Sequence, residues 1–325
     1  MAAPLTPLTP ITVALDWTPN ANHAGFYLAS ARGLYAARGL AVGFRLPDED
    51  AYALAPAKAV LQGAADFAVA PSETAIAYAT GGPEARLVAV AALLQTDTSA
   101  IAALAASGVA RPRDLDGKTY ASYAARFELA TVKAMVRADG GRGELTEVVP
   151  PRLACFDEVL AGRADATWIF SPHEGVLAAE KGVALAAFRP TDFGVPYGYS
   201  PVLLAAPATL AARPADVRAF LAATAEGFRL AAADADAAAD ALRAESRHAS
   251  LADAAFVRAS VRAAAPAFLN AAGAWGEMEP ARWSAFIDFL AAEGLLTADR
   301  SGAPVAPEHL PTAARVATND FLPAQ

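Results

Sequence analysis

Apolar and polar positions along the chain follow two alternating periods. Short β-branched and apolar runs have the length and composition of buried strands, at 11–17 (ITVALDW), 41–46 (AVGFRL) and 65–71 (ADFAVAP). Between them, other segments carry apolar residues at helical spacing and end at glycine, at 22–40, 51–63 and 72–82. Strands that alternate with helices predict a largely parallel sheet covered by helices, and hence an α/β fold.

A comparable unit begins near residue 111. A polar turn leads into a strand at 118–122, and a helix is expected over 127–141. The run VLQGAADFAVA, from Val60, is similar to VLAGRADATWIF, from Val159: in each, a helix ends at glycine and an Asp precedes an apolar strand. This similarity has two possible origins: the helix-turn-strand arrangement is common in α/β proteins generally, or the chain contains two similar α/β lobes.

Beyond residue 207 the pattern is helical. The segment 214–246 is rich in alanine and carries a polar stripe. Farther along, 279–296 places Trp283, Phe286, Phe289 and Leu290 on one helical face, where core packing is expected.

Composition narrows the class of protein. The 325 residues exceed the usual size of one hydrophobic core, so two lobes are expected, and apolar residues make up 55% of the chain. The net charge is −8 and no Lys/Arg-rich run is present, so we expect neither nucleic acid nor a membrane surface as a partner. No run reaches the roughly 20 uninterrupted apolar residues of a membrane span.

The single cysteine and the first residues bear on the compartment. Cys155 cannot form an internal disulfide, and we interpret it as a small buried apolar residue rather than a nucleophile. The first strand-like run is preceded by neither a basic n-region nor an apolar h-region. The chain as written is therefore expected to be cytoplasmic, or periplasmic if a signal has been lost by truncation.

Most catalytic signatures are missing from the sequence. It has no Gly-rich phosphate loop followed by Lys and no Gly-x-Ser-x-Gly elbow, and the HEG at 173–175 lacks the second His of a zinc-binding helix. The four histidines are scattered singly, so no metal site is expected.

What stands out instead is a set of aromatic, amide-bearing and acidic residues at or just beyond the ends of expected strands, namely Trp17, Asn20, His23, Ser72, Glu73, Tyr123, Trp168, Glu174, Tyr197 and Tyr199. In open parallel sheets, ligands bind beyond the carboxyl ends of the strands. Aromatic faces, amides and one acid suit a small nitrogen heterocycle. Core packing of Trp17 and Trp168, a solvated Glu174 and local capping by His23 are the alternatives.

These residues lie in motifs that resemble a known family. LDWTPNANHAGFYLASARGLYAARGL, DFAVAPSE, DLDGKTYASYAARFELA, DATWIFSPHEG and FGVPYGYSPVLL together resemble the thiamin-pyrimidine group of the SsuA/thiamin pyrimidine synthase-like family. That group contains formylaminopyrimidine-binding proteins of ABC transporters and the fungal thiamin pyrimidine synthases. The resemblance implies a type II periplasmic-binding-protein fold, with two α/β lobes, a hinge and an interlobe ligand cleft.

On that pattern, lobe 1 would be residues 1–105 plus 197–325 and lobe 2 residues 106–196. The resemblance also assigns roles. Trp17 matches the aromatic residue that faces the cleft, and Asn20 the amide beside it. Glu174 matches the acid that bonds the aminopyrimidine, and Tyr197 and Tyr199 match the loop that closes over the ring.

The chain departs from the synthase pattern at two positions. The fungal enzymes supply a lysine that holds pyridoxal phosphate and a histidine that is consumed, where this chain has Ala70 and Thr74. It also lacks their cysteine-rich run. A Schiff base cannot form on alanine, so a binding protein without a cofactor is favoured over an enzyme.

Two other functions stay open on the sequence. A synthase-like enzyme would need Lys58 or Lys118 as the replacement amine and His23 or His173 as the donor, with pyridoxal phosphate as cofactor. A receptor for an alkanesulfonate or aromatic acid would use Arg126 and a helix N-terminus to meet the anion, although a solvated arginine fits equally well. The expected partners of the preferred binding protein are a small pyrimidine and an ABC permease.

Overall fold

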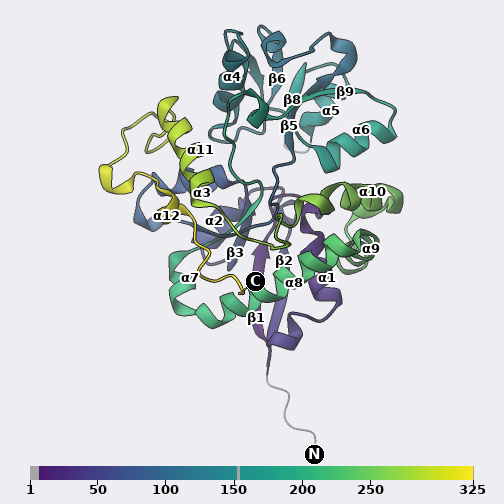
Figure 1. Cartoon of the computed structure of the whole chain (residues 1–325), viewed down its shortest axis with the longest axis vertical. Helices are drawn as coiled ribbons and strands as arrows, with labels where there is room; N and C mark the ends of the chain where they lie inside the picture. The colour runs from purple at the N-terminus through teal and green to yellow at the C-terminus, as the bar shows by residue number, and fades with distance from the viewer. Residues whose placement is uncertain (1–6, 152–153, 325) are drawn as a thin grey trace, which may run out of the picture. The chain divides into compact units, whose positions relative to one another are not determined.

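The chain forms two compact α/β units, each built around a five-stranded sheet (Figure 1). The computed structural model describes residues 7–151 and 154–324. Unit 1 comprises residues 1–96, 199–280 and 311–325, and unit 2 comprises residues 97–198 and 281–310. The alternation of strands and helices in the sequence thus predicted the α/β class correctly.

Unit 1 contains a mostly parallel sheet with the strand order β2-β1-β3-β10-β4, in which β10 is antiparallel to both of its neighbours. Its strands are β1 (Thr9–Ala14), β2 (Leu40–Arg45), β3 (Phe67–Ala70), β4 (Val88–Ala92) and β10 (Val202–Ala205). Phe67 and Val69 belong to one core cluster, while Ala68 and Ala70 point to the other side, yet all four are at most 5% exposed. Both faces of the sheet are therefore buried, as a parallel sheet requires.

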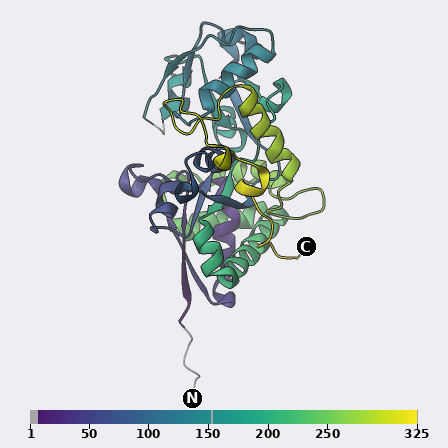
Figure 2. The same ribbon diagram turned by 90° about the vertical axis from the view of Figure 1, so that its left-hand side faces the viewer.

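Helices cover both faces of this sheet (Figures 1 and 2). Those that share the cluster of Phe67 and Val69 are α1 (Ala24–Ala31), α7 (Pro207–Ala212), α8 (Pro214–Ala233), α9 (Ala235–Ser246) and α10 (Ala254–Ala264). The other helices of the unit are α2 (Pro56–Leu61), α3 (Ser72–Ala79) and α12 (Ala313–Val316).

Helices α1 and α8 approach each other through a pair of glycines. A Cβ built on Gly227 would lie 2.3 Å from the Gly25 carbonyl oxygen, and a Cβ built on Gly25 would lie 2.3 Å from ring atoms of Phe228. Phe228 is fully buried against Phe268 and Trp275, so its ring has no room to move. Glycine is therefore needed at 227 because the α1 backbone lies too close for a methyl, and at 25 because the Phe228 ring does.

Unit 2 contains a mixed sheet with the strand order β7-β6-β8-β5-β9, in which β5 is antiparallel to β8 and β9. Its strands are β5 (Ser99–Leu104), β6 (Thr119–Ala121), β7 (Thr146–Val148), β8 (Ala166–Phe170) and β9 (Leu185–Phe188). Its helices are α4 (Glu128–Ala138), α5 (Cys155–Leu160), α6 (Val176–Glu180) and, apart from its first residue, α11 (Pro280–Ala292).

The two similar sequences that begin at Val60 and Val159 form the same pattern of hydrogen bonds. Asp66, just before β3, exchanges hydrogen bonds with Thr12 of β1: its carboxylate accepts from the Thr12 amide at 2.8 Å, and its own amide donates to the Thr12 carbonyl at 2.9 Å. Asp165, just before β8, does the same with Thr119 of β6, at 2.8 Å for both bonds. Each Asp therefore ties its own strand to the neighbouring one.

Residues 281–310 fold with unit 2, whereas the predicted boundaries assigned them to lobe 1. The reason is a set of contacts to unit 2: Phe286 packs against Tyr197, Arg137 pairs with Glu293, and Arg300 donates to the Ala124 carbonyl at 2.8 Å. Trp283, Phe286 and Leu290 are buried, as their shared helical face predicted, but Phe289 is partly exposed.

Two expected helices are less than half as long as the sequence pattern predicts. The helix expected over 51–63 begins only at Pro56, because Ala51 and Tyr52 adopt left-handed conformations with φ of 53° and 64°. The helix expected over 22–40 stops at Ala31, since Gly33 turns the chain with φ of 67°. In the part of the chain that the structure describes, no helix combines the length and apolar character needed to cross a membrane.

The close approach of α1 and α8 can be tested with Gly227→Ala. We expect this substitution to lower the free energy of unfolding by about 1–3 kcal/mol, because the added methyl must push two helices apart. Urea unfolding measures the change. Gly43→Ala is the control: no atom lies within 4 Å of its Cβ position, so a change within about 0.5 kcal/mol is expected. Equal effects of the two substitutions would contradict the prediction.

Candidate functional site

The turn after β1 carries three of the predicted site residues in unit 1. Asn20 caps the 3₁₀ turn η1 (Ala21–His23): its side-chain oxygen accepts from the Asn22 amide at 2.9 Å, and its side-chain nitrogen donates to the Thr18 carbonyl at 2.9 Å. The amide predicted to face a ligand is thus engaged in shaping the turn itself, as an N-cap residue does.

His23 is fully buried and connects this turn to Asp16. Its Nδ1 accepts from the Asn20 backbone amide at 3.3 Å, so the ring proton lies on Nε2, which donates to Asp16 Oδ1 at 3.0 Å. The Asp16 side chain stays 26% exposed. His23 therefore orients a carboxylate that faces solvent. Asp16 was absent from the predicted set, although its place directly after the first strand and before Trp17 could have indicated it.

Trp17 follows Asp16 and is partly exposed. Its ring lies 5.8 Å from that of Tyr52, at an interplanar angle of 57°. Beyond the carboxyl end of β1, unit 1 thus presents an aromatic pair next to an oriented acid. Tyr52 was missed in the sequence because its segment fits the start of a helix.

Ser72, Glu73 and Tyr199 belong to a second group in unit 1. Ser72, the first residue of α3, donates its amide to the Tyr199 carbonyl at 2.9 Å and accepts from the Tyr199 amide on its hydroxyl at 3.1 Å. The Tyr199 hydroxyl accepts from the Glu279 amide at 2.9 Å. Ser72 and Tyr199 are at most 2% exposed and Glu73 is 6% exposed. Ser72 and Tyr199 thus join α3 to the chain that enters β10, and Ser72 does not cap its own helix.

Glu174 is a buried acid of unit 2. It lies in a single π-turn, η8 (Ser171–Gly175), directly after β8, and its carboxylate accepts from the Phe170 amide at 2.8 Å. Only 8% of the residue is exposed. Burial raises the pKa of this carboxyl above its ordinary value of 4.5, against the opposing influence of His173 and of backbone hydrogen bonds. Single π-turns occur frequently at functional sites.

Tyr123 lies in the electrostatic field of Glu174. Burial first, and then the negative charges of Glu174 and Glu128, hold the pKa of the Tyr123 phenol well above its usual range. The buried Glu128 accepts from the Tyr120 hydroxyl at 2.8 Å, the Tyr123 amide at 3.1 Å and the Ala125 amide at 3.2 Å. Glu128 therefore fixes the loop that carries Tyr123.

Cys155 shares this environment. It is fully buried, and burial together with nearby carboxylates raises the pKa of its thiol to about 12. A thiol of that pKa stays protonated and is a poor nucleophile. The interpretation of Cys155 as a small buried apolar residue is confirmed.

Trp168 and Tyr197 are brought together in unit 2. Their ring centroids lie 5.0 Å apart, and Tyr197 in turn meets Phe286 edge-on at 5.1 Å. Trp168 is 7% exposed and Tyr197 is 4% exposed. These three rings form an aromatic row from β8 to α11.

Arg126, expected as an anion contact, is bonded to the chain itself. Its guanidinium donates to the Thr297 carbonyl, to the Thr297 hydroxyl at 3.1 Å and to the Asp299 carbonyl at 3.3 Å. Burial and the neighbouring Arg300 lower the pKa of Arg126. Within unit 2, Arg126 therefore anchors the segment that follows α11.

The two positions that differ from the fungal synthases lie at the end of β3 and in α3. Ala70 is 5% exposed and pairs with Val202, and Thr74 is partly buried. A methyl and a hydroxyl cannot form a Schiff base, so these positions do not fit pyridoxal phosphate held covalently. The alternative amine Lys118 lies 4.0 Å from Asp165, beside the Asp that ties β8 to β6.

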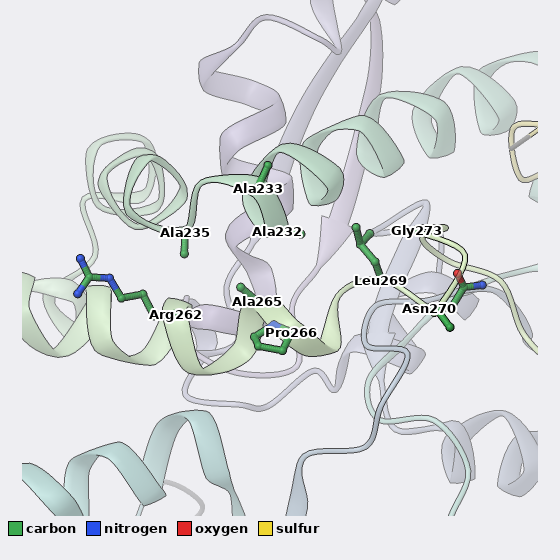
Figure 3. Close-up of a pocket in the computed structure, with 10 residues that line it drawn as sticks. Ala232, Ala233, Ala235, Arg262, Ala265, Pro266, Leu269, Asn270 and Gly273 are labelled. Carbon is green, nitrogen blue, oxygen red and sulfur yellow. The ribbon is translucent and has the colours of Figure 1, made fainter.

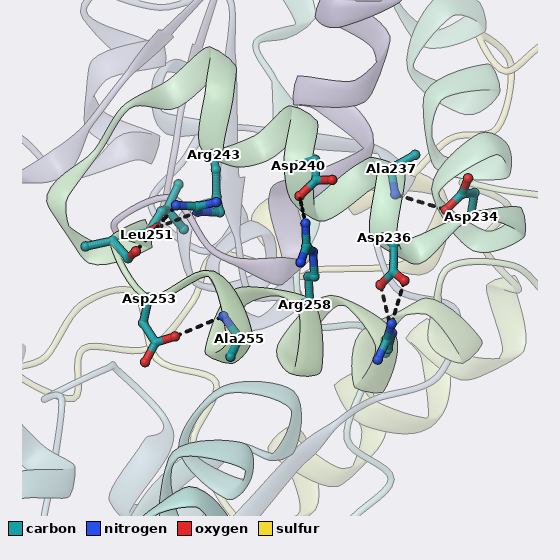
Figure 4. Close-up of polar contacts among 11 residues, drawn as sticks. Asp234, Asp236, Ala237, Asp240, Arg243, Leu251, Asp253, Ala255 and Arg258 are labelled. Carbon is teal, nitrogen blue, oxygen red and sulfur yellow. Dashed lines mark hydrogen bonds and ion pairs between the residues drawn. The ribbon is translucent and has the colours of Figure 1, made fainter.

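A separate open hollow of ≈ 600 Å³ lies on unit 1, lined chiefly by alanines of α8, α9 and the chain that follows α10, together with Leu269 (Figure 3). Its polar side chains serve the fold. Arg262 of α10 forms a two-bonded ion pair with Asp236 of α9. Arg258 of α10 also pairs with Asp240 of α9, at 2.8 Å (Figure 4). Asn270 holds its own loop through the Ala272 and Ala274 amides. The hollow contains none of the predicted site residues.

Comparisons with known proteins agree with the resemblance seen in the motifs. Over 190 residues, 28% are identical to the formylaminopyrimidine-binding protein of Halalkalibacterium halodurans, covering 58% of this chain and 56% of that protein. A putative thiamine biosynthesis protein of Haemophilus influenzae is 27% identical over 200 residues, covering 60% of this chain and 61% of that one. The matched stretches thus span less than two thirds of both relatives.

Solved structures and a family model give the wider context. The periplasmic aliphatic sulphonate binding protein SsuA from Escherichia coli superposes with a TM-score of 0.66 at 16% identity, covering 96% of this chain and 99% of that one. This likeness shows that the chain has the periplasmic-binding-protein fold. The family model described as NMT1/THI5 like matches residues 20–238. The chain belongs to the NMT1/THI5-like family.

Proposed function

We propose that the chain binds a thiamin-precursor pyrimidine of the formylaminopyrimidine or hydroxymethylpyrimidine type. The observation that carries the proposal is the Glu174 carboxyl, 8% exposed, with its pKa raised by burial, in a member of this family. A buried carboxyl of raised pKa can share one proton with an aminopyrimidine across a pair of hydrogen bonds. The printed name of the Halalkalibacterium relative supports the choice of ligand.

The aromatic residues suit the same ligand class. A planar heterocycle gains dispersion and quadrupole contacts from rings such as Trp17, Trp168, Tyr197 and Tyr199. Asp16, oriented by His23, offers a further acceptor for an amino group. Because the side chains of Asn20 and Ser72 are bonded within unit 1, we assign them, with His23, to shaping the site rather than to pairing with the ring.

We further propose that the bound pyrimidine is handed to an ABC permease, and that the protein acts outside the cytoplasm. The fold supports this, since the sulphonate-binding protein of the same fold is periplasmic by its printed name. The comparisons give no support to the cytoplasmic location expected from the sequence. Under this proposal the protein needs no cofactor.

Glu174→Gln tests the role of the acid. We expect pyrimidine binding to weaken by about 1.5–3 kcal/mol, which corresponds to roughly 10- to 150-fold in Kd, because the charge-assisted pair is lost. Isothermal titration with formylaminopyrimidine and hydroxymethylpyrimidine measures it. Glu180→Gln, an exposed acid at the end of α6, is the matched control and should bind as the wild type does. Unchanged binding by the Glu174 variant would remove Glu174 from the site.

The same substitution should change stability with pH. Because burial raises the pKa of Glu174 above 4.5, the folded state keeps the proton longer than the unfolded chain does, and ionisation of the carboxyl destabilises the fold as the pH rises above 4.5. Gln cannot ionise. The free energy of unfolding of Glu174→Gln relative to the wild type should therefore increase from pH 4 to pH 8, as denaturant unfolding across that range would show. A difference that falls with pH would contradict the raised pKa.

A spectroscopic comparison addresses the synthase alternative. Because Ala70 stands where the synthases carry a lysine, we expect the absorbance spectrum of the protein mixed with pyridoxal phosphate to equal the sum of the two separate spectra. Mass spectrometry should find all four histidines intact after incubation. A new absorbance band together with loss of a histidine would instead support synthesis.

A further inference from the structure

The chain after β2 contains a strained segment. Following the 3₁₀ turn η3 (Pro47–Asp50), Ala51 and Tyr52 are both left-handed, with φ of 53° and 64°. For residues with a side chain this region is unfavourable, and most of all for a bulky one such as tyrosine. Two such residues in succession persist only where the surrounding structure holds them.

Bonds within the segment fix this conformation. The Tyr52 amide donates to the Pro47 carbonyl at 2.7 Å. The Asp50 carboxylate accepts from Arg45 at 2.5 Å and from the Leu54 amide at 3.2 Å. Asp50 thus clamps the strand before the turn to the chain beyond it.

A second clamp joins the segment to other parts of unit 1. His248 Nδ1 accepts from the Ser250 amide at 3.1 Å, so its Nε2 carries the proton and donates to Asp48 at 2.7 Å. The Ser250 hydroxyl donates to the Pro19 carbonyl at 3.2 Å. The turn that carries Trp17 and the segment that carries Tyr52 are therefore held to the same short loop at 248–250.

The strained geometry places Tyr52 against Trp17. Their ring centroids are 5.8 Å apart, and both residues are partly exposed. A third ring stacked between two others needs about 7 Å between the outer rings, because each contact takes roughly 3.5 Å. With this spacing and a tilt of 57°, the two rings cannot hold a ligand ring between them, and they form a single angled wall.

We infer that Tyr52 is a ligand-contacting residue that determines specificity for planar rings, extending the aromatic wall begun by Trp17. The inference rests on the proposed function for the identity of the ligand. A wall of two tilted rings contacts one face and one edge of a planar heterocycle, whereas an aliphatic ligand gains less from it. The strain and the two clamps serve to keep Tyr52 in that position.

Ala51→Gly and Tyr52→Gly form a matched pair of variants. Comparing them separates the effect of losing the Tyr52 ring from the effect of relieving backbone strain. Both substitutions place glycine at a left-handed position, but only the second removes an aromatic ring. We expect Ala51→Gly to bind formylaminopyrimidine within twofold of the wild type, and Tyr52→Gly to bind about tenfold more weakly. Tyr52→Phe, which keeps the ring, should bind within threefold. Thermal unfolding midpoints of the glycine variants should not fall below that of the wild type.

Isothermal titration with formylaminopyrimidine, a benzenesulfonate and an aliphatic sulfonate distinguishes the outcomes. Equal affinity of Tyr52→Gly and Ala51→Gly for the pyrimidine would overturn the inference while leaving the proposed function intact. If the wild type bound only benzenesulfonate and Tyr52→Gly weakened that binding, the proposed function would fail and the role of Tyr52 would stand. Wild-type protein that bound only the aliphatic sulfonate, or none of the three, would overturn both.

Discussion

The fold of unit 1 depends on burying both faces of a sheet with mostly small side chains. Alanine contributes little volume, so the covering helices must come very close to each other and to the strands. Gly25 and Gly227 make that approach feasible for α1 and α8, because a methyl on Gly227 would collide with the Gly25 backbone and a methyl on Gly25 would collide with the Phe228 ring. The position of α1 in turn fixes the preceding turn, because His23 is buried at the start of this helix and holds both Asn20 and Asp16.

Carboxylates perform two structural tasks in this protein, and we propose a third, ligand binding, for Glu174; the surroundings of each carboxylate decide its task. Asp66 and Asp165, partly exposed and each close to a cation, tie neighbouring strands together. Glu128 is buried among donors and fixes a loop. Glu174 is equally buried, and the structure gives its side chain a backbone partner at Phe170. Desolvation raises the pKa of both Glu128 and Glu174, but the Glu128 carboxylate already accepts the three hydrogen bonds that fix its loop, so Glu174 is the better suited of the two to exchange a proton with a bound base.

Several of the residues chosen from the sequence are engaged in bonds within the fold. Ser72 bonds to Tyr199, which is 127 residues away, and Arg126 bonds to Thr297, which is 171 residues away. No local pattern indicates such partners. In contrast, the two residues that the structure adds, Asp16 and Tyr52, owe their orientation to a buried histidine and to a strained turn, and neither has a periodic signature in the sequence.

The sequence by itself determined the alternation of strands and helices, the repeated helix-Asp-strand unit and the family. These properties depend on short-range periodicity and local motifs, and both are contained in the order of the residues alone. Only the tertiary structure decided that 281–310 joins unit 2, that Asn20 and Arg126 serve the fold, and that Tyr52 meets Trp17. Each of these outcomes depends on contacts between residues distant in the chain, whose energies arise only once the packed core brings them together.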